Sequence, residues 1–139
     1  MINFQYETNF ELEDTNKYTN WIIEIVKSEK AIIGDLGYIF CSDNYLYELN
    51  QKYLNHNSFT DIITFDYSAK KVISGEVYIS IDRIRENALK FNEEFKNELL
   101  RVMAHGVLHL LGYKDKSKLD KKEMRIKEDE KINMFHVEQ

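Results

Sequence analysis

The sequence predicts an α+β fold, in which helices and a small, mixed four-stranded sheet form an α/β/α sandwich. The first observation behind this prediction is the order of periodicities, which runs strand, helix, strand, helix, two strands, and then helices to the end. The second is the short turn between the last two strands, which predicts that they pair antiparallel. The third is the length of 139 residues without a Pro-rich linker, from which we expect a single domain covering 1–139.

The first two predicted elements have different periodicities. Residues 2–8 alternate apolar and polar side chains, as a half-buried strand does. Residues 13–30 instead place apolar side chains at helical spacing, and Asp14 or Thr15 is the expected N-cap of that helix.

The middle of the chain predicts three strands and one helix. Residues 34–42 are almost continuously apolar, which is typical of an interior strand, and residues 43–54 return to helical spacing. Residues 60–67 are rich in β-branched and aromatic side chains, and residues 75–81 again alternate as a strand does.

The last third of the chain is predicted to be helical. Asp82 is the expected cap of a helix that ends near Phe91, and a second helix covers about 93–111. A charged helix with few apolar anchors follows over about 117–135.

Net charge and cysteine content limit the class of protein. The formal net charge of −5 argues against a protein that holds nucleic acid by bulk electrostatics. Residues 114–131 nevertheless contain eight Lys or Arg against six Asp or Glu, which indicates either a solvated helix face or a local positive potential. Cys41 lies in an apolar run, and we find no secretory signal or membrane-spanning segment. These features predict a buried thiol in a cytoplasmic protein that contacts no membrane.

A candidate metal site lies in the segment Met103-Ala-His-Gly-Val-Leu-His-Leu-Leu-Gly-Tyr-Lys-Asp115. His105 and His109 are four residues apart, so a helix presents both on one face. Gly112 is suited to leaving a helix through a left-handed conformation, which can return Asp115 to that face. Two imidazoles and a carboxylate, with a fourth position left to water, are typical of catalytic zinc. We therefore expect one Zn²⁺ per chain, held by these two histidines and the aspartate.

The residue after the first histidine bears on the chemistry of this site. Zinc peptidases with the pattern His-Glu-x-x-His use that glutamate as general base, and here the position is Gly106. No other protein base is assigned, so the expected nucleophile is a metal-bound water, and a phosphodiester suits a metal that polarises a phosphoryl oxygen. A purely structural role for both histidines is disfavoured, because burying an imidazole without a partner costs about 1–3 kcal/mol.

The segment His105-Gly-Val-Leu-His109-Leu-Leu-Gly112-Tyr113-Lys-Asp115 resembles the signature of the YbeY family of bacterial metal-dependent endoribonucleases. Three further segments match that family in order and spacing, and they are Leu49-Asn-Gln-Lys-Tyr53, Thr60-Asp-Ile-Ile-Thr-Phe65 and Gly75-Glu-Val-Tyr-Ile-Ser80. The resemblance implies a zincin-like fold and a zinc-dependent, single-strand-specific endoribonuclease. It also implies a role in 16S rRNA 3′-end maturation and ribosome quality control. The implied partners are single-stranded RNA and the small ribosomal subunit with its assembly factors, and not DNA.

Two positions depart from the family pattern. The third metal ligand of the family is usually a histidine, and here it is Asp115, a carboxylate that zinc also accepts. The family usually has an arginine immediately after the position of Tyr53, and here that residue is Leu54. The chain therefore lacks a bidentate phosphate partner at this position. Compensating substrate contacts are expected from Lys114, Lys116 or His56.

Acidic residues outside the triad are weaker candidates for the site. Glu98 lies on roughly the same helix face as His105 and can accept a histidine N–H, and Asp61 can shape the cleft floor beside the ligands. Glu76, expected on an edge strand, is a candidate replacement base. Two other functions stay open, namely a zincin-like peptidase and a non-catalytic ribosome-assembly factor with a structural metal. Structural zinc usually has four protein ligands, which argues against the second.

Overall fold

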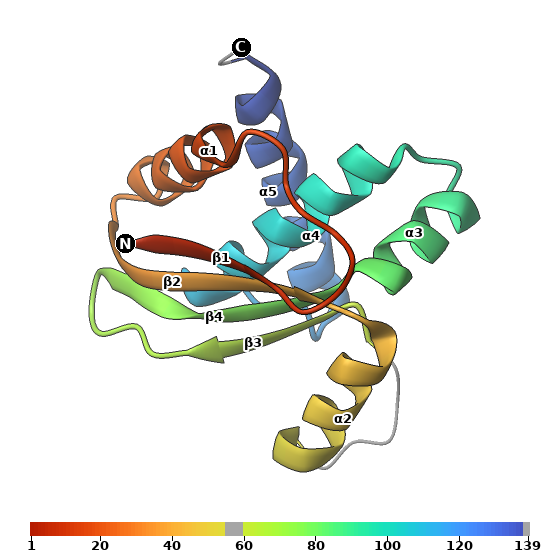
Figure 1. The fold of residues 1–139 in the computed structure, drawn as a ribbon. Helices are drawn as coiled ribbons and strands as arrows, with labels where there is room; N and C mark the ends of the chain where they lie inside the picture. The colour runs from red at the N-terminus through yellow and green to blue at the C-terminus, as the bar shows by residue number, and fades with distance from the viewer. Residues whose placement is uncertain (55–59, 138–139) are drawn as a thin grey trace.

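The computed structural model describes residues 1–54 and 60–137, which form five helices and a four-stranded mixed sheet (Figure 1). The predicted α+β fold is therefore confirmed. In chain order the elements are β1 (Ile2–Tyr6), α1 (Thr15–Ser28), β2 (Ile32–Cys41), α2 (Asp43–Leu54), β3 (Ile62–Asp66), β4 (Val72–Ser80), α3 (Ile81–Lys90), α4 (Phe95–Leu110) and α5 (Lys118–Val137). Among the described residues, no helix combines the length and hydropathy needed to span a membrane.

The strands are ordered β1-β2-β4-β3 in the sheet. β1 and β4 both run parallel to β2, and β3 pairs antiparallel with β4, so the predicted hairpin and the predicted interior position of β2 are confirmed. β4 is also interior, because it is paired on both sides, and this corrects the expected place of Glu76. Glu76 is in register with Gly37 of β2 and Phe65 of β3, and its side chain lines a groove on the face opposite the histidines. It is therefore not placed to act as a base at the candidate metal site.

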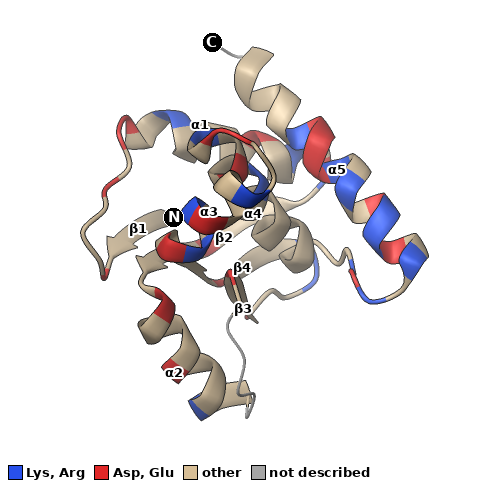
Figure 2. Cartoon of the chain, turned by 90° about the vertical axis from the view of Figure 1, so that its right-hand side faces the viewer, with Lys and Arg blue, Asp and Glu red and all other residues tan. Residues whose placement is uncertain are grey.

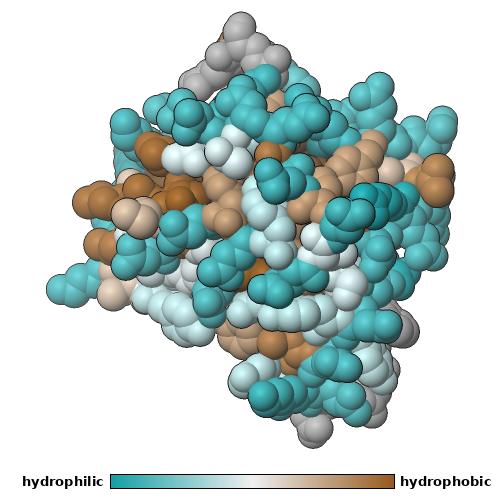
Figure 3. Space-filling view, in the orientation of Figure 1, coloured by the Kyte–Doolittle hydropathy of each residue, from teal (hydrophilic) through white to brown (hydrophobic). Residues whose placement is uncertain are grey.

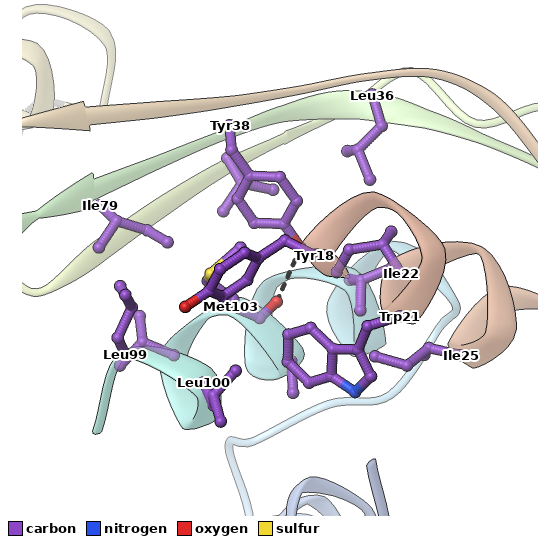
Figure 4. Close-up of a cluster of buried hydrophobic side chains, with 14 of the residues drawn as sticks. Tyr18, Trp21, Ile22, Ile25, Leu36, Tyr38, Ile79, Leu99, Leu100 and Met103 are labelled. Carbon is purple, nitrogen blue, oxygen red and sulfur yellow. Dashed lines mark hydrogen bonds between the residues drawn. The ribbon is translucent and has the colours of Figure 1, made fainter. Parts of the chain in front are cut away.

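One face of the sheet packs against α1 and α4 and carries the main hydrophobic core. Figure 4 shows side chains from the sheet, α1 and α4 in this core, and those labelled are Tyr18, Trp21, Ile22, Ile25, Leu36, Tyr38, Ile79, Leu99, Leu100 and Met103. The fully buried Tyr38 hydroxyl donates a hydrogen bond of 2.8 Å to the carbonyl of Met103. This bond satisfies a buried polar group and ties α4 to β2, so the helix with both histidines is fixed on the sheet.

The opposite face of the sheet is covered at one end by α2, whose first turn contacts the start of α3 (Figure 1). This helix helps to bury a small cluster of Cys41, Leu46 and Ile63. Burial raises the pKa of the Cys41 thiol to about 12, so this cysteine is an unreactive core residue, as the sequence predicts.

The helix caps differ in part from those predicted. Ser80, not Asp82, caps α3, because its Oγ accepts a hydrogen bond from the N–H of Arg83 (3.1 Å) and the helix begins directly after it. The Asp82 carboxylate instead accepts a hydrogen bond from the N–H of Asp43 at the start of α2 (2.9 Å). Asp14 occupies the N-cap position of α1, but its φ is +53° and its side chain makes no capping bond.

Candidate metal centre

α4 carries both histidines and packs closely against the sheet at Gly106, where no side chain separates the helix from the strands. A Cβ atom at Gly106 would lie 2.7 Å from Val77 Cγ1 and 3.2 Å from Ile62 Cδ1. Carbon atoms in packed interiors are usually about 3.5–4.0 Å apart, so glycine is the residue that fits this approach. Position 106 therefore faces β3 and β4, whereas His105 and His109 line a pocket.

The turn after α4 brings the chain back toward the histidines. Gly112 has a φ of +106°, a conformation that favours glycine. Its N–H and that of Tyr113 both donate 3.0 Å hydrogen bonds to carbonyls of the last helical turn, which is the pair that defines a Schellman motif. Asp115 consequently lies beside both imidazoles, and its Oδ2 is 3.2 Å from His105 Nε2 and 3.4 Å from His109 Nε2.

The donor atoms of His105, His109 and Asp115 all lie within 4.8 Å of one another. Across 1–54 and 60–137, no other group of three His, Cys, Asp or Glu side chains converges in this way. Two imidazole nitrogens and a carboxylate oxygen are donors that zinc accepts, and three protein ligands leave a position for water or substrate. The chemistry of this donor set therefore fits a divalent transition metal.

The Nδ1 atoms of the histidines contact partners that differ from the Glu98 we expected. His105 Nδ1 lies 2.7 Å from Glu128 Oε2, and His109 Nδ1 lies 3.0 Å from the carbonyl of Tyr113. A carboxylate or a carbonyl in that place favours protonation of Nδ1 and leaves the lone pair on Nε2. Both Nε2 atoms are the ones that face Asp115.

Glu128, on α5, is itself held by an arginine. Arg101 donates to Glu128 Oε1 (3.0 Å) and to Asp129 Oδ1 (2.7 Å), so the two oxygens of Glu128 are shared between Arg101 and His105. Burial lowers the pKa of His105, but the hydrogen bond with Glu128 and the charges of Glu128, Asp115 and Asp61 outweigh it and raise the pKa above its ordinary value. The carboxylate therefore makes the imidazole more basic as well as orienting it.

Tyr113 is held from the side of α1 by a second network. Its hydroxyl donates a hydrogen bond to Glu29 Oε1 (2.6 Å). The ammonium groups of Lys127 (3.2 Å) and Lys131 (2.8 Å) both donate to Glu29 Oε2. Lys131 is fully buried and also donates to Ser28 Oγ (2.8 Å). Burial favours the neutral form of Glu29, but these hydrogen bonds outweigh it and lower its pKa to about 2.

The candidate ligands line a pocket with a volume of about 490 Å³. Its walls come from the residues before and within β3, from α3, α4 and α5, and from the loop after α4, and the lining residues are Thr60, Asp61, Ile62, Thr64, Asn87, Phe91, Glu98, Arg101, Val102, His105, His109, Asp115, Arg125 and Glu128. Four carboxylates and two arginines are among them, so the described wall is acidic without a metal. A bound divalent cation would offset that charge.

Asp61 and Glu98, both expected near the ligands, line this pocket. Burial raises the pKa of Asp61, against the opposing charge of His105. Burial and then the neighbouring Asp61 raise the pKa of Glu98. Both acids lie beside the triad, but the histidine Nδ1 atoms are bonded to Glu128 and to a carbonyl.

The residues expected to contact substrate are not in the described wall of the pocket. Lys114 and Lys116 are exposed on the loop after α4, Leu54 ends α2, and all three are absent from the pocket lining. His56 lies outside the described residues. Blue and red segments alternate along α5 (Figure 2), so most of its charge forms a mixed, solvated face. The positive side chains in the wall are instead Arg101 and Arg125.

Glu128, Arg101 and Arg125 were missed by sequence reasoning, although α5 contained a signal. The buried positions of α5 are Met124, Glu128, Lys131 and Phe135, which have the spacing of one helix face. Charged residues at two positions of that apolar stripe indicate buried polar partners elsewhere in the fold. Their partners, His105 on α4 and Glu29 just after α1, cannot be identified from spacing because they lie on distant segments of the chain.

Comparisons with known proteins show the family to which this chain belongs. The family model described as Endoribonuclease YbeY matches residues 1–136. Endoribonuclease YbeY of Flavobacterium psychrophilum is 55% identical over 139 residues, covering 100% of this chain and 99% of the relative. The Flavobacterium johnsoniae protein of the same name is 52% identical and covers 100% of both chains. The solution structure of a Thermotoga maritima protein aligns with a TM-score of 0.70 at 32% identity, covering 99% of this chain and 91% of that one.

Proposed function

Because this chain belongs to the YbeY endoribonuclease family, we propose that it is a zinc-dependent endoribonuclease that hydrolyses phosphodiester bonds in single-stranded RNA. In this proposal it acts in the cytoplasm on the 3′ end of 16S ribosomal RNA and in ribosome quality control, with the small subunit and its assembly factors as partners. The observation that carries the proposal is the convergence of His105, His109 and Asp115 in a pocket of a family member.

His105, His109 and Asp115 would hold the zinc ion through two nitrogens and one oxygen. When bound, zinc supplies a Lewis acid for a phosphoryl oxygen and a hydroxide nucleophile near neutral pH. The protein's own part is orientation. Glu128 and the Tyr113 carbonyl accept the Nδ1 protons, which turns both Nε2 atoms toward Asp115. The placement of Asp61 and Glu98 in the wall supports their role as neighbours that tune the site.

The packing of Gly106 argues against a peptidase. A glutamate at this position would have to displace Val77 and Ile62, and it would face the sheet and not the pocket. The His-Glu-x-x-His base therefore has no place in this packing. The non-catalytic alternative also lacks support, because structural zinc usually has four protein ligands and only three converge in the described residues.

The test is cleavage of single-stranded RNA by the wild type and by His109→Ala, with zinc content measured on both proteins. Loss of a ligand should remove zinc and lower cleavage by roughly 100-fold or more. His136→Ala is the matched control, because this histidine is exposed near the end of α5 and outside the pocket. Equal cleavage by wild type and His109→Ala would overturn the mechanism. Unprocessed 16S 3′ ends in cells that contain only His109→Ala would support the cellular role, and normal ends would reject it.

A further inference from the structure

The wall of the pocket formed by α3 contains an aromatic ring that the fold does not bury. Phe91 follows the last residue of α3, its exposed fraction is 58%, and it lines the same pocket as the metal triad. It is not part of either hydrophobic cluster of the described residues. Figure 3 shows apolar surface at the outer end of α3, where Leu89 is also exposed. An exposed phenyl ring in a polar pocket is available to a ligand.

The wall formed by α5 contributes a guanidinium group with no fixed partner. Arg101 is held by Glu128 and Asp129, but within the described residues the Arg125 guanidinium makes no hydrogen bond or ion pair. Its charge opposes the rise in the pKa of Glu98 that burial causes, which places it within electrostatic reach of the pocket interior. Arg125 is therefore the arginine in this wall that can take up a phosphate without first losing a partner.

We propose that Phe91 and Arg125 form a nucleotide subsite beside the metal centre, in which the ring stacks on an unpaired base and the guanidinium binds a backbone phosphate. This inference rests on the proposed function, because it names the substrate contacts of the same pocket. Stacking on aromatic side chains and pairing of phosphate with arginine are the usual contacts of single-stranded nucleic acid with proteins.

The subsite also gives a physical reason for a preference for single strands. A base within a duplex is already stacked on both faces, so it must leave the helix before a protein ring can contact it. Phe91 offers its contact only to bases that are free. Asn87 lies one helical turn before Phe91 and lines the same wall, so its amide can hydrogen-bond the edge of a stacked base. The Lys90 ammonium, 5.7 Å from the Phe91 ring centroid, adds positive charge beside the ring.

The first experiment measures binding, so that it does not depend on catalysis. A short single-stranded oligoribonucleotide containing 2-aminopurine is titrated with the protein as purified, and a gel then confirms that the oligonucleotide is intact. We expect fluorescence quenching by the wild type, about tenfold weaker binding with little quenching by Phe91→Ala, and recovery in Phe91→Trp. Leu89→Ala is the matched control, since Leu89 is exposed on the same helix and does not line the pocket. A duplex of the same sequence should bind Phe91→Ala and wild type alike.

The second measurement separates the phosphate contact from the base contact. Arg125→Ala should weaken binding of all sequences and reduce the slope of log affinity against log salt by roughly 0.7, while quenching at saturation persists. Lys121→Ala, an exposed cation of the same helix outside the pocket, should leave the slope unchanged. Equal binding and quenching by Phe91→Ala and wild type, or no binding by the wild type, would overturn the subsite. Stacking without any cleavage would reject the proposed function and keep the subsite.

Discussion

The two candidate histidine ligands are supported by different kinds of network. His105 is held by a side chain, the Glu128 carboxylate, which Arg101 holds in turn. His109 is held by the backbone carbonyl of Tyr113, and the loop that carries it is tied to Glu29 through the tyrosine hydroxyl. A side-chain carboxylate places a negative charge beside the imidazole and can be removed by one substitution. A backbone carbonyl fixes the tautomer and orientation of the imidazole without a full charge, and substitutions can move it only by changing the surrounding fold.

The largest expected effect comes from breaking the network on the His109 side. Glu29→Ala leaves the buried Lys131 ammonium with the neutral Ser28 Oγ at 2.8 Å and only a longer contact of 3.8 Å to the Glu130 carboxylate, so we expect a loss of about 3–5 kcal/mol in the free energy of unfolding. Urea denaturation measures it. The double variant Glu29→Gln, Lys131→Met should be more stable than Glu29→Ala, because no uncompensated charge stays in the interior. A loss under about 1 kcal/mol in Glu29→Ala would show that this network does not stabilise the fold.

Removal of the Glu128 carboxylate beside His105 should lower zinc affinity more than it lowers the stability of the fold. Glu128→Gln keeps the shape of the side chain but removes its charge, so we expect zinc affinity to fall roughly 10- to 100-fold. Competition with a chelator of known affinity measures this. Glu123→Gln, an exposed position of the same helix, removes the same charge away from the pocket and should leave zinc affinity unchanged. Equal affinity in Glu128→Gln and wild type would mean that the two supports are alike.

Acidification should separate the wild type from a variant without the Glu29 charge. The folded-state pKa of Glu29 is about 2, below the value of about 4.5 for an unperturbed glutamate. Its contribution to stability is therefore complete above pH 4.5 and is lost as the pH falls toward 2. The stability difference between wild type and Glu29→Gln should shrink over this interval, as followed by urea denaturation at several pH values. A difference that stays constant would contradict the lowered pKa.

The smallest expected effect comes from removing the hydrogen bond between Glu29 and Tyr113 in the loop after α4. Tyr113→Phe removes the hydroxyl but keeps the carbonyl that contacts His109, and Glu29 retains both lysines. We expect a loss of about 1 kcal/mol in stability and less than about threefold in zinc affinity. A larger loss of zinc than in Glu128→Gln would reverse the ranking of the two supports.

Local geometry explains why the triad could be predicted from the sequence. The helical spacing of His105 and His109, together with the turn at Gly112, brings Asp115 back to the histidines, so all the information lies in one short segment. The type and order of helices and strands were also predicted, since periodicity is local.

The supports and the pocket walls depend on packing between distant segments. Glu128 lies 23 residues from His105, and Glu29 lies 84 residues from Tyr113. The expectation for Glu98 used helix-face spacing alone, and α5 placed another carboxylate nearer to the imidazole. The prediction that Glu76 lies on an edge strand is wrong, because periodicity identifies a strand but not its place in the order of the sheet.

The close approach of α4 to β4 at Gly106 also restricts the mutational routes open to this fold. Gly106→Glu is the substitution that would complete a His-Glu-x-x-His pattern, and its side chain would have to displace Val77 and Ile62. Smaller residues at these two positions would have to come first, and each alone would leave a cavity with its own loss of stability. A directed-evolution route to this pattern therefore has to begin in the sheet, with changes at Val77 and Ile62 before a glutamate at position 106 can be accommodated.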